Sequence, residues 1–449
     1  MNKYKKSLFI FRRDLRLEDN TGLILALQKS EKVIPCFIYD TTLAKKFSKS
    51  SFRWNFLNQS LIDLDLELRK NKTALQVFQG IPSGIVQKII FNEEVDAIFV
   101  NADFSNYSKK RDKEISEICK KNNVDFNSHL DFVLHNPNEI KTNDGKPYTI
   151  YSHFFKKARQ SPVRKIIKNS KNNYKMNTVS DKIIQKVEIE NYLIPGGRKN
   201  GLKILYNLEK FKNYDKDRNY PGSDSTTKLS AHNKFGTISI REVFHAIQDQ
   251  LGFDHTLMRE IYWREFFNYI LFHFPESNRR SFKTRFRKIP WSRSQIKFNA
   301  WCNGKTGFPI VDAGMKELNN TGFLHNRVRM IVASFLTKDL HIHWKWGERF
   351  FSKKLIDYDP AVNAGNWQWT ASTGCDAVPY FRIFNPWLQQ EKFDANCIYI
   401  KKWIPELAGI SPKIIHNLWK SFPKDLKYTK PILNHKVESQ KAKEIFKLQ

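Results

Sequence analysis

Short apolar runs alternate with amphipathic segments over the first 130 or so residues. The apolar runs predict buried strands at Ser7–Phe11, Val33–Tyr39, Ala74–Phe78 and Ala97–Val100. The amphipathic segments predict helices at Thr21–Gln28, Trp54–Arg69, Ile85–Phe91 and Arg111–Lys120. Strands separated by helices imply right-handed crossovers, so we expect a parallel sheet with helices on both faces.

The periodicity weakens from about residue 127 to residue 195, where polar and basic runs predict a connection with one or two short helices. After Gly201 the pattern is helical throughout. Its clearest helices are Ile261–Phe274, Ala313–Leu318, Arg327–Leu340 and Lys401–Leu407, and the lysine-rich end predicts a frayed basic helix. We therefore expect an α/β domain over 1–130, a linker over 131–200 and an all-α domain over 201–449.

Composition narrows the class of protein. No stretch approaches the roughly 20 apolar residues of a membrane span, and the start of the chain does not resemble a signal peptide. Five cysteines without CxxC spacing predict neither a disulfide framework nor a zinc site, which favours the cytoplasm. The 76 Lys and Arg exceed the 45 Asp and Glu by 31 charges, and this excess favours a nucleic acid as partner over a membrane.

The segment Tyr214–Gly236 combines a Pro-Gly turn with the run Ser-Asp-Ser-Thr-Thr. Its hydroxyl groups predict a cap for a following helix. Together with the amides of that helix they would also form a site for a phosphate or pyrophosphate. A cap without any ligand is the more common use of such a run, so both interpretations stay open.

Three further segments combine polar and aromatic residues. On a helix, Glu260, Trp263 and Arg264 would share one face, as an exposed ion pair beside a packed indole or as a functional surface. Gly322–Leu336 carries two arginines that need anionic partners if they are buried. Asp357–Thr373 offers two carboxylates before a Trp-Gln-Trp sequence, either lining a pocket or forming a solvated loop before core tryptophans.

Taken together, these segments resemble the DNA photolyase/cryptochrome family, and most of all its class I cyclobutane pyrimidine dimer photolyases. The matching motifs are RRDLRLEDN, TTKLS, EIYWREF, GKTGFPIVDAGMKELNNTGFLHNRVRM, ASFLTKDL, DYDPAVNAGNWQWTASTG and FRIFNPWLQQEKFD. They occur in order along nearly the whole chain and are weakest between about 135 and 200. The resemblance implies an N-terminal α/β antenna domain and an all-α C-terminal domain that binds FAD and the DNA lesion.

The resemblance also implies residues that bind FAD. By motif position these are Tyr214, Thr226, Thr227, Lys228, Leu229, Ser230, Arg329, Asp357, Asp359 and Asn363. Asp357 would pair with Arg329 near the isoalloxazine, and Asp359 would bind the polar edge of the flavin. Asn363 would face flavin N5, where a neutral amide is compatible with an anionic reduced flavin.

The activity implied by the resemblance is light-driven repair of pyrimidine dimers in UV-damaged DNA. FADH⁻, excited directly or through an antenna, would pass one electron to a flipped-out dimer and take it back after the cyclobutane bonds break. The catalytic residues would be Glu260, Asn326 and Met330, with Trp263 and Trp369 as flat walls for the dimer. Contacts to the DNA or the pocket rim would come from Arg218, Arg264, Arg327, Arg382 and Gln389.

A chain of tryptophans would reduce oxidised FAD, running from Trp367 through Trp344 to Trp291 at the surface. The antenna is open: Ser105 stands where one folate-binding pattern has Glu, which leaves folate, a deazaflavin, another chromophore or none. Leu257 stands where some relatives carry Trp. No metal is implied, and we expect a monomer that works in the cytoplasm.

Three other functions compete with this prediction. A cryptochrome-type blue-light photoreceptor would share the fold, because fold does not determine function. A (6-4) photolyase would be expected to carry a histidine at position 330, which is Met330 here. A nucleic-acid-binding protein without chemistry would explain the charge but not the pocket motifs.

Overall fold

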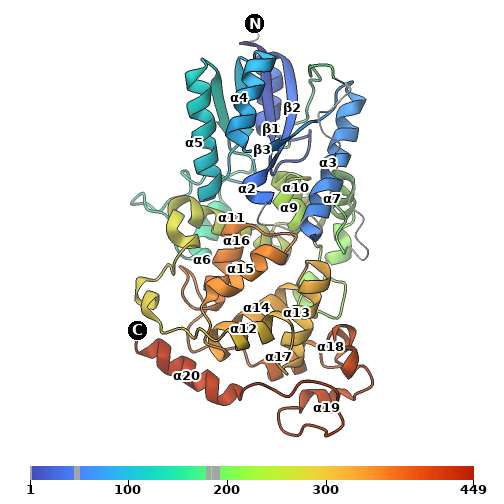
Figure 1. Cartoon of the computed structure of the whole chain (residues 1–449), viewed down its shortest axis with the longest axis vertical. Helices are drawn as coiled ribbons and strands as arrows, with labels where there is room; N and C mark the ends of the chain where they lie inside the picture. Colours follow the sequence, from blue (N-terminus) through green and yellow to red (C-terminus); the bar gives the residue numbers. More distant parts are fainter. Residues whose placement is uncertain (1–2, 45–50, 178–183, 185–192) are drawn as a thin grey trace. The chain divides into compact units, whose positions relative to one another are not determined.

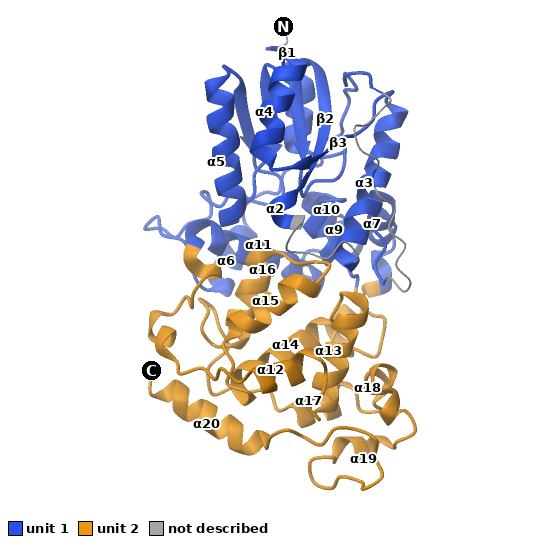
Figure 2. Cartoon of the chain, in the orientation of Figure 1, with its two compact units in different colours: residues 1–210, 227–275 blue, residues 211–226, 276–449 orange. Residues whose placement is uncertain are grey.

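The computed structural model describes residues 3–44, 51–177, 184 and 193–449. These residues form two compact units, one of residues 1–210 and 227–275 and one of residues 211–226 and 276–449 (Figure 2). The helices of 227–275 belong to the unit that contains the sheet, and the domain boundaries expected at 130 and 200 stay predictions.

A five-stranded parallel sheet forms the first unit's centre (Figure 1). Its strands are β1 (Tyr4–Phe11), β2 (Ser30–Asp40), β3 (Gln76–Gly80), β4 (Ala97–Asn101) and β5 (Asp125–His129), in the order β3-β2-β1-β4-β5. Ser7 of β1 pairs with Val33 on one side and with Ala97 on the other. The strand order therefore reverses beside β1, as in doubly wound folds.

Helices cover both faces of this sheet, as expected from the alternating pattern. On one face Leu8 and Ile10 pack with Val86 of α4 (Pro82–Glu93) and Ile115 of α5 (Asn106–Lys121). The opposite face carries α1 (Thr21–Lys29), where a Cβ added to Gly22 would lie 3.1 Å from the ring of Phe9. Side chains that alternate between the faces of a strand produce this division.

The sequence interpretation missed strand β5 and did not predict that the linker pairs with residues in and beside the sheet. The sequence of β5, DFNSH, has no apolar alternation because it forms a sheet edge and its side chains are half-buried or exposed. Tyr174 forms a parallel bridge with Val33, and Asn177 forms one with Thr73. The predicted linker thus returns to the sheet, and its helix is α6 (Tyr151–Ala158).

A buried ion-pair network joins the N-terminal motif to a later helix of the same unit. Arg241, on α10 (Ile240–Leu251), lies 2.7 Å from Asp19 and 2.9 Å from Asp131, and Arg16 pairs with Asp131 at 2.5 Å. All four side chains are 2% exposed or less. The two guanidinium groups hold the pKa of the Asp131 carboxyl well below its usual range. Removing one partner would leave a buried charge uncompensated.

The remaining helices divide between the two units. In the first unit they are α2 (Thr41–Ala44), α3 (Phe52–Lys70), α7 (Arg198–Leu205), α9 (Ser230–Phe235) and α11 (Thr256–His273). In the second unit they are α8 (Tyr214–Asp217), α12 (Gln295–Cys302), α13 (Pro309–Thr321), α14 (Asn326–Ser334), α15 (Trp344–Lys354), α16 (Pro360–Thr370), α17 (Pro386–Phe393), α18 (Ile398–Trp403), α19 (Pro412–His416) and α20 (His435–Lys447). A π-helical turn, Phe335–Asp339, extends α14. None of the helices in the described ranges is long and apolar enough to cross a membrane.

The C-terminal helix α20 is docked on the second unit, whereas the sequence predicted a frayed basic helix. Phe446 near its end is 3% exposed. At the start of α20, His435 lies 2.5 Å from Asp339, and Glu438 lies 2.7 Å from His341. The lysines face solvent while Ala442 and Phe446 are buried, so counting charges alone missed this narrow apolar face.

Candidate functional site

Helix α11 presents Glu260, Trp263 and Arg264 on one face, as their spacing predicted. His255 caps the start of the helix by accepting the N–H of Leu257 at 3.3 Å. Arg264 donates to the carbonyl of Phe132 at 2.9 Å. Glu260 and Trp263 are half-buried, so both groups are held by the helix without being removed from solvent.

Tyr151, which the sequence interpretation missed, covers one face of Trp263. The two rings lie 3.6 Å apart between centroids and are nearly parallel, at 7°. The Tyr151 hydroxyl donates to the carbonyl of Arg259 at 2.9 Å. Burial and the nearby charge of Glu260 raise the pKa of Tyr151 well above its usual range, so it stays neutral. Tyr151 lies in the stretch where the motifs are weakest, which left no signal for it.

Glu265 fixes α11 to the segment that follows β5. Its carboxyl accepts the backbone N–H groups of Leu134 at 2.9 Å and His135 at 3.1 Å. Burial raises the pKa of Glu265 to about 7. This carboxyl positions the helix that carries Glu260 and Trp263, and it was not predicted because a single Glu among aromatic residues has no distinctive pattern.

In the second unit, α14 presents Asn326, Arg327, Arg329 and Met330. The Asn326 amide lies 4.0 Å from the sulfur of Met330, one turn further on, as the spacing predicted. Arg327 donates to the Asn219 side chain and lies 4.4 Å over the ring of Phe393. These contacts hold the guanidinium of Arg327 inside the unit.

Arg329 and Asp357 form the expected ion pair. The distance between Arg329 Nη2 and Asp357 Oδ2 is 2.9 Å, and Arg329 Nε donates to the Leu324 carbonyl at 2.7 Å. The Asp357 side chain is 6% exposed, and its other oxygen has no hydrogen-bond partner among the described residues. A buried acceptor without a donor is costly unless a bound group satisfies it, so Asp357 fits a cofactor with an N–H or O–H donor.

Asp359 and Asn363 lie at the start and middle of α16. Asp359 caps the helix by accepting the N–H groups of Ala361 at 3.0 Å and Val362 at 3.4 Å. The Asn363 amide donates to Glu348 Oε1 at 3.1 Å and to the Glu348 carbonyl at 3.2 Å. A backbone carbonyl only accepts hydrogen bonds, so the NH₂ group of Asn363 is directed at Glu348 and its carbonyl oxygen points away. Glu348 was not predicted.

The hydroxyl-rich run does not cap a helix, which corrects the prediction. Helix α9 begins after Leu229 without a side-chain cap hydrogen bond. Ser223 and Ser225 donate to the carbonyls of Tyr220 and Asp217, both at 2.8 Å. These hydroxyls stabilise their own turn, because Ser side chains compete for nearby backbone groups.

The run expected to bind FAD crosses a boundary at which the chain passes from one unit to the other. Thr226 belongs to the second unit, while Thr227, Lys228, Leu229 and Ser230 belong to the first. Lys228 has a positive φ of 53°, and Leu229 is 5% exposed. Tyr214 lies in the second unit with Arg218 5.5 Å over its ring. The role of this run in binding FAD stays a prediction.

The three tryptophans of the expected chain all lie in the second unit. Trp367 is 2% exposed and lies so close to Gly347 that an added Cβ would be 2.1 Å from its ring. Gly347 lies one turn after Trp344, which is fully buried and donates to Ser281 Oγ at 3.3 Å. Trp291, expected as the surface end of the chain, is half-buried and packs against Phe446 of α20.

The other residues expected at the DNA contact differ in exposure. Arg382 is exposed and Trp369 is half-buried. The side-chain oxygen of Gln389 is buried and meets no donor within the described part of the chain. Arg382 is therefore available to a phosphate, and Gln389 has an acceptor that a ligand could satisfy.

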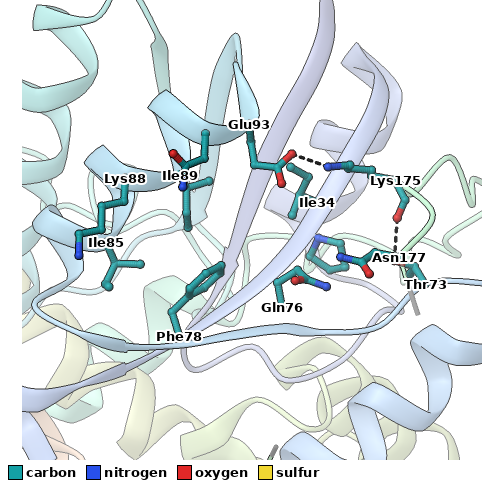
Figure 3. Close-up of a pocket in the computed structure, with 12 residues that line it drawn as sticks. Ile34, Thr73, Gln76, Phe78, Ile85, Lys88, Ile89, Glu93, Lys175 and Asn177 are labelled. Carbon is teal, nitrogen blue, oxygen red and sulfur yellow. Dashed lines mark hydrogen bonds and ion pairs between the residues drawn. The ribbon is translucent and has the colours of Figure 1, made fainter. Parts of the chain in front are cut away.

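A pocket of about 360 Å³ lies in the first unit between α4 and the strands β2 and β3 (Figure 3). Ile34, Phe78 and Ile89 form apolar walls, and Lys175 pairs with Glu93 at its rim. None of the functional-site residues that the sequence predicted lines this pocket. No group of three or more His, Cys, Asp or Glu that could hold a metal ion occurs in the described ranges.

Comparison with known families gives two matches. A DNA photolyase model matches residues 7–169, and a model for the FAD binding domain of DNA photolyase matches residues 257–448. A deoxyribodipyrimidine photo-lyase of Alkalihalophilus pseudofirmus is 33% identical, with 97% of each chain covered. One of Agrobacterium fabrum is 34% identical, with 96% of this chain and 95% of that protein covered.

Solved structures of two photolyases and a cryptochrome are similar to this chain over almost its whole length. An archaeal photolyase from Sulfolobus tokodaii with two FAD molecules has a TM-score of 0.87 and 38% identity over 99% of this chain and 100% of that one. A bacterial class III photolyase from Agrobacterium tumefaciens has a TM-score of 0.90 and 31% identity over 100% and 98%. A Synechocystis cryptochrome has a TM-score of 0.89 and 27% identity over 99% and 100%.

Proposed function

The chain belongs to the DNA photolyase family, and on that premise we propose that it repairs cyclobutane pyrimidine dimers in UV-damaged DNA, using light and FAD. The observation that carries the proposal is the buried pair of Arg329 and Asp357, which leaves one carboxylate oxygen of Asp357 for a donor on the cofactor. The curated relatives named deoxyribodipyrimidine photo-lyase support this activity. The class I assignment is part of the proposal, since one similar structure is a class III photolyase.

FAD would be bound by residues of two sequence segments, one around Tyr214 to Ser230 and one around Asp357 to Asn363. When bound, FAD would supply the redox chemistry for a light-driven exchange of one electron with the dimer. Asp357 would accept a hydrogen bond from the cofactor, and Asp359 would bind the polar edge of the flavin. Tyr214 and the run from Thr226 to Ser230 would bind its diphosphate and ribityl region.

Asn363 would face flavin N5 with its carbonyl oxygen. Its NH₂ group is already committed to Glu348, so the oxygen is the atom that remains for the cofactor. An amide oxygen can accept a hydrogen bond from an N–H group without placing a full negative charge near an anionic flavin. Glu348 therefore acts through Asn363, by orienting it.

The dimer would be bound by flat and polar side chains. Trp263 would stack on the dimer with the face that Tyr151 does not cover, and Tyr151 keeps the indole in place. Glu260 would hydrogen-bond a pyrimidine and stabilise the charge that develops on the dimer after the electron arrives. Asn326, Met330 and Trp369 would complete the contacts.

The electron that activates oxidised FAD would travel through Trp367, Trp344 and Trp291. Close packing of Trp367 on Gly347 brings the first indole against the helix that begins with the second. DNA affinity would come from the excess of 31 positive charges and from residues such as Arg382, supported by Arg218, Arg264, Arg327 and Gln389. The monomeric state and the cytoplasmic location stay predictions.

A second chromophore is part of the proposal without an identity. The similar archaeal photolyase holds two FAD molecules, which supports a second chromophore in this fold. Ser105 caps α5 by accepting the N–H of Ser108 at 3.2 Å, so it has a structural use at the position where one folate pattern has Glu. Folate, a deazaflavin, a flavin or no antenna are the alternatives that the chromophore content of the purified protein would separate.

The test is repair of an oligonucleotide that contains one thymine dimer. The purified protein is reduced by light, mixed with the oligonucleotide and exposed to blue light, with a dark sample as control. We expect loss of the dimer only in the illuminated sample. A flavin-containing protein that binds DNA without removing the dimer would refute repair and favour a cryptochrome-type photoreceptor, for which the Synechocystis structure is the supporting likeness.

A further inference from the structure

Two rings from distant parts of the second unit pack against Trp291. His343 lies 5.3 Å from it between ring centroids, and Phe446 of α20 meets it edge-on at 6.1 Å. The indole nitrogen of Trp291 is buried and has no hydrogen-bond partner among the described residues. Without such a bond, packing against neighbouring side chains determines how this indole is oriented.

His343 contacts both outer tryptophans of the expected chain. Its ring lies 5.6 Å from the ring of Trp344 as well as 5.3 Å from that of Trp291. Nδ1 of His343 accepts the N–H of Lys345 at 3.0 Å as the cap of α15, which fixes the ring. Burial and the charges of Lys345 and Arg349 lower the pKa of His343 to about 4, so the ring is neutral at physiological pH.

Phe446 is held in place by the docking of α20. Its ring packs against Phe286 at 5.3 Å, and the ammonium group of Lys338 lies 3.4 Å from its centroid. Tyr380 is parallel to it at 6.3 Å. Together with the ion pairs at the start of α20, these contacts determine where the edge of Phe446 meets Trp291.

We propose that His343 and Phe446 are positioning residues for electron transfer, which hold the Trp291 indole between them and make the C-terminal helix part of the path that activates the flavin. The proposal rests on the proposed role of Trp291. The His343 ring contacts the indoles of both Trp291 and Trp344, and Phe446 would restrict rotation of the Trp291 indole. Electron transfer weakens when packed atoms are replaced by a gap or when the donor moves.

Two variants of His343 separate its ring from its function as a helix cap. His343→Asn keeps a side-chain acceptor for the Lys345 N–H and removes the ring, whereas His343→Phe keeps a ring and removes the acceptor. Phe446→Leu keeps apolar volume without the aromatic edge. Val437→Ala is the matched control, since Val437 lies on the same helix and is 48% exposed.

The experiment compares two rates for each full-length variant with bound FAD. One is the blue-light reduction of oxidised FAD with an external reductant in excess, and the other is repair of a dimer oligonucleotide after chemical reduction. We expect His343→Asn and Phe446→Leu to slow photoreduction of FAD about tenfold. In His343→Phe and Val437→Ala, FAD should be photoreduced at the wild-type rate. Repair after chemical reduction should be unchanged in all four, which shows that the fold and the repair site are intact.

Wild-type photoreduction in His343→Asn or Phe446→Leu would overturn the proposal. So would equal slowing in His343→Asn and His343→Phe, which would assign the effect to the helix cap. A Trp291→Phe variant is measured beside them. If it photoreduces like the wild type, the expected tryptophan chain is wrong and this proposal falls with it, whereas repair failing in the wild type would refute the proposed function separately.

Discussion

The side-chain amide of Asn363 donates to Glu348 at 3.1 Å, and this bond determines which end of the amide can face a ligand. Both residues are buried, and Glu348 also lies 3.4 Å from Lys345 and from the hydroxyl of Tyr358. Glu348 is therefore held in place from several sides. The amide of Asn363 could otherwise take two orientations, and this hydrogen bond selects the one in which its oxygen is free to accept.

Asn363→Asp should weaken the reduced, anionic state of the flavin. The variant places a second carboxyl where the amide now lies 3.1 Å from Glu348. The two carboxyl groups repel each other unless one of them is protonated. We expect a lower reduction potential of the bound flavin, measured by spectroscopic redox titration. Asn366→Asp is the control, because Asn366 lies on the same helix and is exposed. An equal shift in both variants would assign the effect to helix charge and contradict the proposed position of Asn363.

Glu260→Gln should lower the repair yield per photon moderately, and Glu260→Ala should lower it more. Glutamine can still donate a hydrogen bond to the charge that develops on the dimer, whereas alanine cannot. DNA affinity should change little, because phosphate contacts provide most of it. The measurements are dimer affinity and single-photon repair yield. A loss of affinity with an unchanged yield would make Glu260 a binding residue.

Trp263→Ala should mainly reduce discrimination between damaged and intact DNA. The lost stacking is worth roughly 1–3 kcal/mol on the scale of base–aromatic contacts. Binding competition between dimer-containing and intact oligonucleotides measures it. Tyr151→Leu should have a smaller effect in the same direction, because it only frees the indole that Tyr151 covers. A larger effect for Tyr151→Leu would assign the stacking surface to Tyr151.

Binding to dimer-containing DNA should weaken steeply as the salt concentration rises. Neutralised phosphates release counterions on binding, and each contact contributes to the slope of affinity against salt. Arg382→Ala should reduce that slope by about one unit if Arg382 contacts a phosphate. Lys72→Ala, an exposed residue in the first unit, is the control. A slope unchanged by Arg382→Ala would remove this residue from the DNA contact.

Lys338→Met should stabilise the protein most near and below neutral pH. Burial lowers the pKa of Lys338 to about 7, from 10.5 for the ordinary group, so the unfolded chain binds a proton that the folded chain lacks between these values. Stability contributed by this site therefore rises with pH from about 7 to 10.5, and the buried charge costs most below it. We expect a gain of about 1–2 kcal/mol at about pH 6.5.

Urea unfolding at about pH 6.5 and about pH 9.5 tests this expectation, with the exposed Lys436→Met as control. The gain from Lys338→Met should shrink at the higher pH, because the folded wild type then carries a neutral amine hydrogen-bonded to Ser372 at 3.0 Å. A gain that is the same at both values would mean that desolvation of the charge is not the cause.

Apolar runs predicted the main elements well. The first four strands were predicted because each contains a short apolar run, and the helix carrying Glu260 and Trp263 was predicted because apolar positions occur along most of its length, where most of them are buried. β5 was missed because an edge strand buries too little to show alternation. The same limit applies to α20, whose lysines hid a narrow apolar face that ends in Phe446.

The site was predicted where a matching motif contains the residue and missed where the residue lies outside the motifs. The pair of Arg329 and Asp357 was expected from motif positions and is present. Tyr151 and Glu348 contact Trp263 and Asn363 through tertiary packing, which local spacing does not record. The contact of Trp291 with Phe446, which lies 155 positions later, was missed for the same reason.

The ion-pair network of Arg16, Asp19, Asp131 and Arg241 has a consequence for how the N-terminal motif tolerates change. These side chains hold the chain together without touching any of the expected photochemical groups. Substitutions there would leave a buried charge alone and reduce the amount of intact protein in the cell. In a survey of variants scored by survival after ultraviolet exposure, such changes would score as badly as loss of Glu260, yet the molecules that do fold would repair DNA at the normal rate.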